Sequence, residues 1–599
     1  MKILLLLIFL FLSFEKIAFS NENDLKVVIT PTRFEQSISK TNSFITVISE
    51  DDIKSSSASS LLEVLNTQTS LGIASTGGTG SVASYFLRGF AKKYLKVTID
   101  GMNIADPTAT QSETYLQDIP LGDIKKIEIL KSPQGSIHGG EAGGGVIAIT
   151  TKEPKYNSKQ FSQKLQVGSY NSVYTGTYIS AGKKNYKLSA NINAYHTDGI
   201  SSMDENDGNE EKDAYNFVNA TIKTKIRTDQ NNVTFVFRDS NSKNEYDDSF
   251  GKQDRHDFTK TNIQAGLVKF EFKTGKNLSH FVSYNPTRVN RRVGGTYPSD
   301  QSSKKHKLEY LIQKKIKNKH FVALGLEHNN TKYKNGQTKE KRESDAFFVQ
   351  SQLQITKGTS IDLSMRRDND QIYNEHDSYR AQLGHNLTKN LKLKLSSGTG
   401  YRPPSLYEGN NLANGVSKLN PEKTSNSEIG FDYNNYKNSF FMSGSYFMSK
   451  VKSEIDYSYA KGGYFQGIGK SEIDGYELSA KKYISSNLLG GVSYTFTDSD
   501  KTDKKGPLVP MHKLSSDLNY TVNDFINGGL YLTYQEKAYD TSGVELPSFT
   551  LLGSSMNYKI NENLNSYIKF NNILNQEYQV NRNYGTPDFN FVLGIESKH

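Results

Sequence analysis

From about residue 155 to the last residue, apolar and polar residues alternate in segments of about ten residues. In one of them, Leu188, Ala190 and Ile192 are separated by Ser189 and Asn191. Side chains of a strand point alternately to opposite faces, so the alternation predicts strands with one apolar and one polar face. The same alternation recurs in residues 391–395, 492–497 and 530–534.

Short turns and long polar loops connect these segments. Ser485–Asn487 and Asn561–Asn563 are examples of the short turns. At roughly 20 residues per strand and connection, the segment 154–599 accommodates about 22 antiparallel strands. A closed membrane barrel of that size has a wide lumen, which needs a plug. We therefore expect an all-β transmembrane barrel over residues 154–599.

Residues 42–153 have a different pattern, in which short strands mix with helical segments. Ile45–Ile48 reads as a strand, and Ser49 is a good N-cap for a helix with acids in its first turn. Ser60–Leu65 has apolar residues at helical spacing. These features predict a small α+β domain that plugs the barrel lumen. Two stretches rich in glycine or small polar residues, 72–84 and 103–112, are predicted loops that can contact a ligand.

The first 20 residues have the features of a secretory signal peptide. Lys2 precedes the apolar run Ile3–Phe14, and Ala18-Phe19-Ser20 is a small-x-small cleavage site. The apolar run is too short for a membrane-spanning helix, which needs about 20 residues. We therefore expect the protein to leave the cytoplasm, with residues 21–41 as a linker ahead of the α+β domain.

The linker contains the extended stretch Asp24–Pro31. Val27, Val28, Ile29 and Thr30 are β-branched and favour a strand, and Pro31 ends it because proline lacks the N–H that a strand ladder needs. Such a strand is either an ordinary edge strand of the first domain or a strand that a partner protein adds to its own sheet.

Composition narrows the class of protein. The chain has no cysteine, 36 tyrosines and 47 glycines, with 35% hydrophobic residues and a mean hydropathy of −0.62. A disulfide-stapled secreted domain is excluded, which leaves a large soluble β-protein or an outer-membrane barrel. The net charge of +10 comes from dispersed lysines, read as solvated loops near lipid phosphates, and nucleic-acid binding is not expected.

No catalytic pattern is present in the sequence. There is no G-x-S-x-G segment, no cysteine nucleophile and no pair of histidines at metal-binding spacing. We expect the protein not to be an enzyme and to hold no redox or catalytic cofactor.

Several motifs, in order along the chain, resemble those of TonB-dependent outer-membrane transporters. Leu25–Thr30 looks like the TonB box, and Ile127–Gly135 followed by Gly144–Thr151 is similar to the longest signature of the plug. Within this family the chain most resembles the vitamin B12 (cobalamin) transporters. The other matching segments are Phe86–Gly89 and Val97–Gly101 in the plug, and Gly400–Pro404, Asn420–Lys423, Asp474–Glu477 and Asn571–Tyr578 in the barrel.

The resemblance implies a monomer in the outer membrane of a Gram-negative bacterium, which pairs with TonB and its inner-membrane energising complex. The TonB box would comprise Asp24, Leu25, Lys26, Val27, Val28, Ile29 and Thr30. The ion pairs of the plug core would involve Arg88, Asp100 and Glu128. Substrate would contact the plug loops through Gly77, Gly78, Gly80, Asn103, Thr108 and Gln111.

Two acidic stretches early in the barrel add a metal prediction. In the cobalamin transporters, two neighbouring loops of this kind bind calcium, and Ca²⁺ prefers six to eight oxygen ligands. The alternative is an acidic loop that is merely solvated. The candidate calcium ligands are Glu211, Asp213, Asp247, Asp248 and Asp254.

The function implied is TonB-dependent active import of a scarce, large nutrient. Cobalamin is the first substrate expected, and a ferric siderophore or haem imported by the same mechanism is the alternative. A passive pore or an outer-membrane hydrolase is the third class. It predicts that loss of residues 24–30 leaves activity intact.

Overall fold

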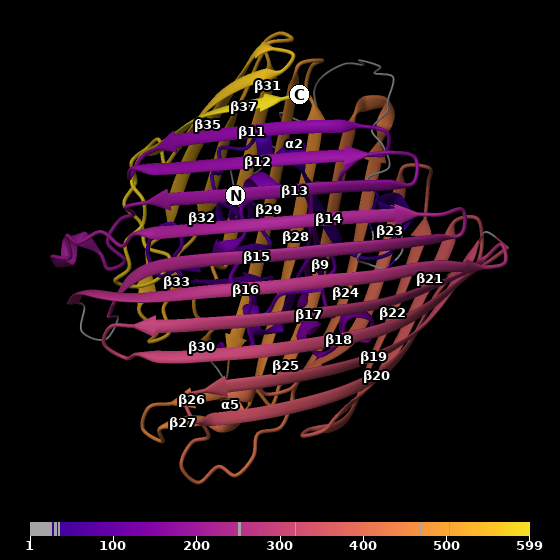
Figure 1. The fold of residues 1–599 in the computed structure, drawn as a ribbon, viewed down its shortest axis with the longest axis horizontal. Helices are drawn as coiled ribbons and strands as arrows, with labels where there is room; N and C mark the ends of the chain where they lie inside the picture. Colours follow the sequence, from indigo (N-terminus) through magenta and orange to yellow (C-terminus); the bar gives the residue numbers. More distant parts are fainter. Residues whose placement is uncertain are drawn as a thin grey trace.

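A computed structural model describes residues 27–28, 33, 36–248, 253–317, 319–467, 469–501 and 504–599. Within these residues the chain forms a closed β-barrel around an N-terminal domain (Figure 1). The barrel has 22 antiparallel strands, and the two-residue β30 (Lys504–Lys505) adds a pairing at one end of β29. The predicted fold is confirmed. The predicted signal peptide, Met1–Ser20, lies outside the described residues.

The barrel wall runs in chain order from β11 to β37, and these two strands close it. Leu165 of β11 pairs with Ile595 of β37. Short turns join the strands at one rim and longer loops at the other, as in outer-membrane barrels with periplasmic turns and extracellular loops. The wall strands are β11 (Lys159–Gly168), β12 (Ser172–Gly182), β13 (Tyr186–Thr197), β14 (Tyr215–Arg227), β15 (Asn231–Asp248), β16 (Gln253–Thr274), β17 (Leu278–Gly294), β18 (Ser299–Ile316), β19 (His320–Asn335), β20 (Thr338–Gln354), β21 (Thr359–Asp370), β22 (Asn374–Asn386), β23 (Leu391–Arg402), β24 (Glu422–Asn435), β25 (Phe440–Lys452), β28 (Lys470–Tyr483), β29 (Leu488–Lys501), β31 (His512–Thr521), β32 (Ile526–Gln535), β35 (Phe549–Asn561), β36 (Leu564–Asn571) and β37 (Asn590–Lys598).

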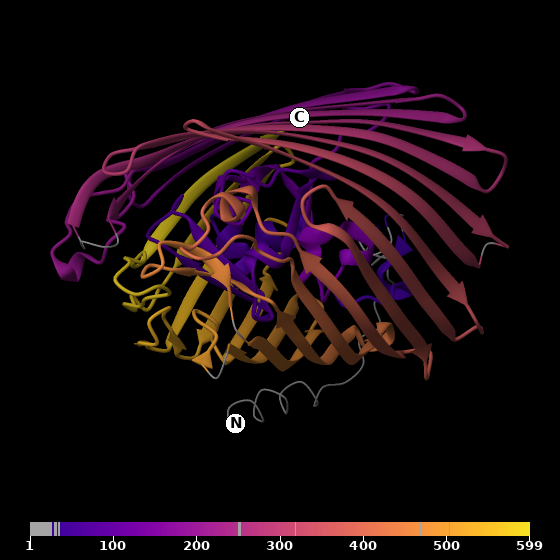
Figure 2. The same ribbon diagram turned by 90° about the horizontal axis from the view of Figure 1, so that it is seen from below.

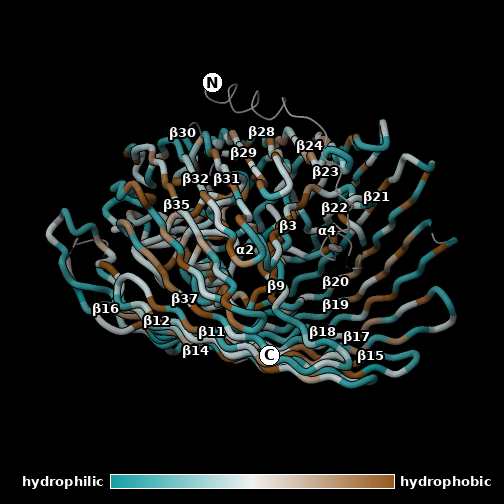
Figure 3. The backbone as a smooth tube through the Cα atoms, turned by 90° about the horizontal axis from the view of Figure 1, so that it is seen from above, coloured by the Kyte–Doolittle hydropathy of each residue, from teal (hydrophilic) through white to brown (hydrophobic). Residues whose placement is uncertain are grey.

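The predicted alternation describes the two faces of this wall. On β13, Leu188 and Ile192 are 44% and 55% exposed, whereas Asn191 between them is buried. Hydrophobic and hydrophilic residues alternate along the wall strands in Figure 3. The apolar face therefore meets lipid, and the polar face meets the plug and the water-filled lumen.

The N-terminal domain lies inside the ring of strands, as Figure 2 shows. Its main sheet has the order β3-β9-β10-β7-β8, in which β10 pairs with β7 in parallel and with β9 antiparallel. A second sheet has the order β4-β5-β6. The plug elements are β3 (Ile45–Ser49), α2 (Glu50–Ser55), α3 (Leu61–Asn66), β4 (Leu71–Ser75), β5 (Ala83–Leu87), β6 (Phe90–Ala91), β7 (Leu95–Ile99), β8 (Met102–Asn103), β9 (Ile124–Lys131), α4 (Gly135–His138) and β10 (Gly145–Thr151).

Local sequence explains the two helices predicted in the plug. Ser49 caps α2 through a reciprocal capping box with Asp52, and Ser60 caps α3 by accepting a hydrogen bond from the N–H of Glu63. The apolar side of α3 places Leu61, Val64 and Leu65 in the plug core. The strand and both helical segments predicted here are confirmed.

The predicted loop 72–84 is wrong at its start and at its end. Residues 71–75 form β4, which pairs with β5, so the loop is confined to residues 76–82. Gly72 lies in this strand beside Pro510, and a Cβ there would stand 3.6 Å from the proline ring, in ordinary van der Waals contact. Glycine is common in loops, and the pairing of β4 with β5 that makes this segment a strand is not visible in its local composition.

No helix among the described residues has the length and apolarity of a membrane-spanning helix.

Candidate functional site

The only described residues of the predicted TonB box, Val27 and Val28, form a two-residue strand. This strand, β1 (Val27–Val28), pairs antiparallel with β2 (Gln36–Ser37) in a sheet of its own. A pairing this short is marginal by itself, so its release costs little free energy. Asp24, Leu25, Lys26, Ile29 and Thr30 lie outside the described residues and stay predictions.

Arg33 anchors the chain just after this strand. Its guanidinium makes ion pairs with Glu309 at 2.7 Å and Glu327 at 2.9 Å, on β18 and β19 of the wall. It also donates a hydrogen bond to the backbone oxygen of Ile137 in α4 and lies 4.7 Å from the ring centre of Phe348. One side chain therefore ties the linker to the barrel wall and to the plug.

The carboxylates around Arg33 have other cationic partners. Glu327 is 2% exposed and lies 2.8 Å from Arg366 and 3.2 Å from Lys307. Lys307 also lies 2.9 Å from Glu309. Removing Arg33 would leave both carboxylates paired, so the cluster can release the linker without stranding a buried charge.

Arg88, the first residue predicted for the plug core, joins the plug to the barrel. It is 4% exposed and lies 2.6 Å from Glu428 and 2.9 Å from Glu477, both on the wall. Burial lowers the pKa of Arg88, but the two carboxylates raise it more, so the net pKa lies above its usual value. Lys131 of β9, which lies in the plug signature Ile127–Gly135, also pairs with Glu477.

Asp100 and Glu128 differ in their partners. Asp100 accepts hydrogen bonds from the backbone and hydroxyl of Thr151, each at 2.9 Å, and pairs with the wall residue Lys223 at 2.7 Å. Glu128 pairs with Lys126 of its own strand at 2.6 Å. Asp100 thus links plug to barrel, while Glu128 is paired within the plug.

The three glycines predicted to meet substrate lie against the barrel. A Cβ on Gly80 would stand 2.1 Å from the ring of Tyr215, and one on Gly77 would stand 2.9 Å from Cα of Ser202. Both have positive φ, +93° and +124°, a region that favours glycine. Gly78 approaches Ile200 in the same way, at 2.9 Å. Close packing against Tyr215 of β14 and against the loop before β14 accounts for these glycines, and a substrate contact stays a prediction.

Of the second predicted loop, Asn103 and Thr108 are buried and internally bonded. Asn103 donates a hydrogen bond to Glu141 at 2.7 Å, and the Thr108 hydroxyl donates to Asp106 at 2.7 Å. Gln111 is only partly buried, and its side chain makes no hydrogen bond within the described chain. Among the three, Gln111 is therefore the side chain free to meet a ligand.

An extracellular hairpin brings tyrosines close to this loop. It consists of β26 (Ile455–Ser458) and β27 (Gly463–Gln466), and it packs on α5 (Leu406–Asn410). The Ser405 hydroxyl before α5 donates to the Thr110 carbonyl of the plug loop at 2.6 Å. We call Tyr407, Tyr457, Tyr459 and Tyr464 the tyrosine surface; their neighbouring ring centres are 5.0 to 6.1 Å apart.

Two rings of the tyrosine surface are open to solvent, whereas Tyr464 is buried beneath them in a small core cluster. Tyr459 is 75% exposed and Tyr457 is 47% exposed. Exposed aromatic rings at the lumen mouth can bind a flat, partly apolar ligand. Sequence reasoning missed this surface, because its residues lie in two loops without a recognisable motif.

Two of the predicted calcium ligands, Asp213 and Asp247, lie close enough to interact. Asp213, in the loop before β14, is 5% exposed, and its Oδ2 accepts from the backbone N–H of Ser202 at 2.6 Å while its Oδ1 has no hydrogen-bond partner. Burial and the neighbouring carboxylate of Asp247 raise the pKa of Asp213 to about 7. A cation beside these two carboxylates would relieve both effects, so the residues fit the predicted calcium.

The other predicted calcium ligands are Glu211, Asp248 and Asp254, and no described side chain among them is grouped with Asp213 and Asp247. Glu211 forms an ion pair with His256 at 2.5 Å. The side chains of Asp248 and Asp254 lie outside the described residues. Among the residues that the structure describes, no group of three or more acidic or histidine side chains could hold a metal ion. Calcium at Asp213 and Asp247 would need further oxygens from backbone or water, and it stays a prediction.

Comparison with known proteins covers both domains. Residues 37–146 match the family model of the TonB-dependent receptor plug domain, and residues 150–573 match that of the TonB-dependent receptor-like β-barrel. A vitamin B12 transporter BtuB from Vibrio cholerae is 24% identical over 597 residues, which cover 95% of this chain and 94% of the relative. A vitamin B12 transporter BtuB from Photobacterium profundum is 23% identical, with the same coverage.

Solved structures share the fold. A mutant of the ferric enterobactin receptor PfeA from Pseudomonas aeruginosa has a TM-score of 0.80 at 16% identity, over 93% of this chain and 98% of the other. The siderophore receptor PirA from Acinetobacter baumannii has a TM-score of 0.78 at 14% identity, over the same shares of the two chains.

Proposed function

The chain belongs to the TonB-dependent receptor family, whose members transport nutrients across the outer membrane of Gram-negative bacteria, and on that premise we propose that its substrate is cobalamin. The members of this family are transporters and receptors rather than enzymes. The observation that carries the proposal is similarity to vitamin B12 transporters over 95% of the chain.

A ferric siderophore is the second candidate. Siderophore receptors share the fold at TM-scores of 0.78 to 0.80, but at 13 to 16% identity. A shared fold does not determine the ligand, because the loops that bind it differ between proteins of the same fold. Sequence similarity over 95% of the chain therefore favours cobalamin, and import of haem or a ferric chelate is the alternative that an experiment has to exclude.

In this proposal the substrate binds between the tyrosine surface and the plug loop around Gln111. The rings offer apolar contact, and the free amide of Gln111 offers a hydrogen bond. The Ser405–Thr110 hydrogen bond connects the two parts, so a ligand that moves one moves the other.

A movement of the plug loop, caused by bound substrate, can be transmitted through side-chain contacts to the opposite side of the plug. Asn103, at the base of the loop, bonds to Glu141, which pairs with Lys305 of the wall at 3.1 Å. Glu141 follows α4, whose Ile137 carbonyl accepts from Arg33. A shift of the loop therefore reaches the anchor of the linker through contiguous contacts, and freed residues 24–30 would add as a strand to TonB.

Calcium has a defined place in this proposal. It would bind at Asp213 and Asp247 and bring the loop before β14 together with the end of β15. Asp247, at the end of β15, already accepts from the backbone N–H of Met203 at 3.2 Å and from that of Arg255 at 3.0 Å. It therefore links the loop before β14 to the start of β16. Ordering these loops would narrow the lumen mouth around the substrate.

Ligand-induced stabilisation of the purified protein tests the substrate. A ligand present at 100 times its dissociation constant stabilises the folded state by about 2.7 kcal/mol. We expect cobalamin to raise the melting temperature, and ferric enterobactin and haem to leave it unchanged. A shift with either iron compound and none with cobalamin would replace the proposal with its alternative.

A further inference from the structure

Four cations stand side by side on the outer wall of the barrel. Arg288 pairs in register with Lys304, Lys304 with Lys332, and Lys332 with Lys341, across β17 to β20. We call these four residues the cation row. Directly opposed side chains of neighbouring strands have Cβ atoms about 5 Å apart, so each cation faces another of the same sign.

The neighbours of the row along each strand show that it points away from the lumen. Thr287 donates to the Asn103 carbonyl of the plug, and Lys305 pairs with Glu141 of the plug. Tyr333 is 3% exposed. Since strand side chains alternate between faces, Arg288, Lys304 and Lys332 point outward, and all three are exposed.

Three members of the row have no counter-ion in the described chain. Lys341 pairs with Glu343 at 2.7 Å. No carboxylate within ion-pair distance and no hydrogen-bond acceptor meets Arg288, Lys304 or Lys332 among the described residues. Like charges in opposed positions are destabilising, so this arrangement favours a bound anion.

The row lies four to six residues beyond the lipid-facing band, toward the extracellular rim. On the same strands and the same face, Tyr284, Leu308 and Leu326 are 39%, 49% and 54% exposed. Between band and row, His306 bonds to the Tyr284 hydroxyl at 2.7 Å. Aromatic residues mark the boundary between hydrocarbon and water, so the row stands at the level of the lipid headgroups.

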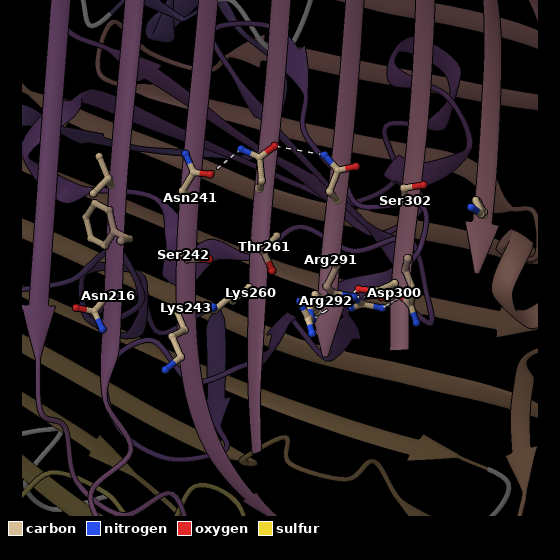
Figure 4. Close-up of a pocket in the computed structure, with 16 residues that line it drawn as sticks. Asn216, Asn241, Ser242, Lys243, Lys260, Thr261, Arg291, Arg292, Asp300 and Ser302 are labelled. Carbon is tan, nitrogen blue, oxygen red and sulfur yellow. Dashed lines mark hydrogen bonds and ion pairs between the residues drawn. The ribbon is translucent and has the colours of Figure 1, made fainter. Parts of the chain in front are cut away.

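A groove of about 600 Å³ adjoins the row on its extracellular side. Amides cross it from strand to strand: Asn262 donates to Asn241 at 2.8 Å, and Asn290 donates to Asn262 at 3.4 Å (Figure 4). Lys260 and Arg292 flank them. Amides both donate to and accept from hydroxyl groups, which are the polar groups of sugars.

We propose that the cation row and this groove bind the phosphorylated sugar headgroup of a lipid in the outer leaflet. The phosphate lies on Arg288, Lys304 and Lys332, the sugar hydroxyls meet the amides of the groove, and the acyl chains follow the apolar band. Charge complementarity selects the phosphate, and the band beneath the row selects a lipid over a soluble anion.

Titration of the detergent-solubilised full-length protein with lipid A, a phosphorylated sugar lipid, tests the proposal by thermal shift. The triple variant R288Q/K304Q/K332Q should bind lipid A about 100-fold more weakly than the wild type, since each surface cation contributes about a factor of five. Its melting temperature without lipid should not fall, because the substitutions remove repulsion.

The matched control is R367Q/K450Q/K505Q, which removes three exposed cations that already have carboxylate partners, at 2.8, 3.1 and 2.5 Å. Its affinity for lipid A should equal that of the wild type. Dephosphorylated lipid A and inorganic phosphate should shift neither protein. Equal affinity of wild type and row variant, equal loss in the control, or an equal response to phosphatidylglycerol would each overturn the proposal.

Discussion

Arg33 is the residue that couples the N-terminal linker to both the barrel wall and the plug, as the proposed transport cycle requires. It comes three residues after Thr30 in the sequence, and its guanidinium touches two carboxylates of the wall and one carbonyl of α4. A pull on residues 24–30 must break these contacts before it reaches the plug. Ion pairs with hydrogen bonds of this kind resist separation. After Arg33 leaves, Lys307 still pairs with both carboxylates and Arg366 with Glu327.

The variant R33Q should therefore free the linker without substrate. Loss of the charged contacts should favour the released state by about 1–3 kcal/mol. The chain has no cysteine, so V28C provides a unique thiol, and its reaction with a water-soluble maleimide should be about 5- to 150-fold faster in R33Q.

The control for this prediction is K307Q, which removes a cation from the same two carboxylates but leaves Arg33 in place. Labelling of V28C should stay at the original rate in K307Q. Equal rates in R33Q and its parent would show that Arg33 does not hold the linker.

At the residue scale, the sequence identified one partner of an important contact but not the other. The motif Phe86–Gly89 pointed to Arg88, but its partners Glu428 and Glu477 lie 340 and 389 residues away in the chain. Arg33 was missed because a single arginine after a short strand carries no periodic or motif signal. Its role depends on Glu309 and Glu327, which only the closed barrel brings to it.

At the scale of elements, β1 is the strand on which the mechanism depends. It pairs through two residues with β2, in a sheet separate from the main sheet of the plug. The pairing keeps the segment folded against the protein and still leaves it easy to detach. Both interpretations of this stretch, an edge strand and a strand offered to a partner, are compatible with the observed pairing.

The variant V28P separates these interpretations. Proline removes a backbone N–H that strand addition to TonB needs. Uptake should fall to the TonB-independent background, while thermal-shift binding of cobalamin should equal that of the wild type. V28A keeps the N–H and should transport normally. Normal uptake by V28P would mean that the segment is only an edge strand.

The acidic loop before β14 gives a second prediction at this scale. If calcium binds at Asp213 and Asp247, chelation should speed hydrogen exchange of amides 198–214 by about 10-fold or more, because a cation no longer balances the buried carboxylates. In D213N exchange should not respond to calcium, whereas the exposed neighbour variant E205Q should respond like the wild type. A response that persists in D213N would exclude this site.

The elements themselves were largely predictable, for a physical reason. Alternation in segments such as Leu188–Ile192 and residues 391–395 follows from a wall with lipid on one side and water on the other. Residues 72–75 were misread as a loop, because the sheet β4-β5-β6 depends on partners that local composition does not show. The tyrosine surface was not predicted, since loops carry no period.

At the scale of the whole molecule, the protein is a plugged barrel whose two ends have different tasks. The extracellular end presents the tyrosine surface, and the Arg33 anchor near the start of the plug holds the segment proposed to pair with TonB. Contacts such as Asp100–Lys223 and Arg88–Glu428 hold the plug in the wall between them. Transport then requires work on the plug, which the proposed partner TonB supplies from the inner membrane.

The most direct measurement is accumulation of labelled cobalamin by cells that make this protein, with and without functional TonB. We expect saturable accumulation only when TonB is present, and none for a variant that lacks residues 24–30 but still binds cobalamin. Accumulation that persists without TonB or without residues 24–30 would contradict the mechanism, and accumulation of a ferric siderophore or haem in place of cobalamin would contradict the substrate.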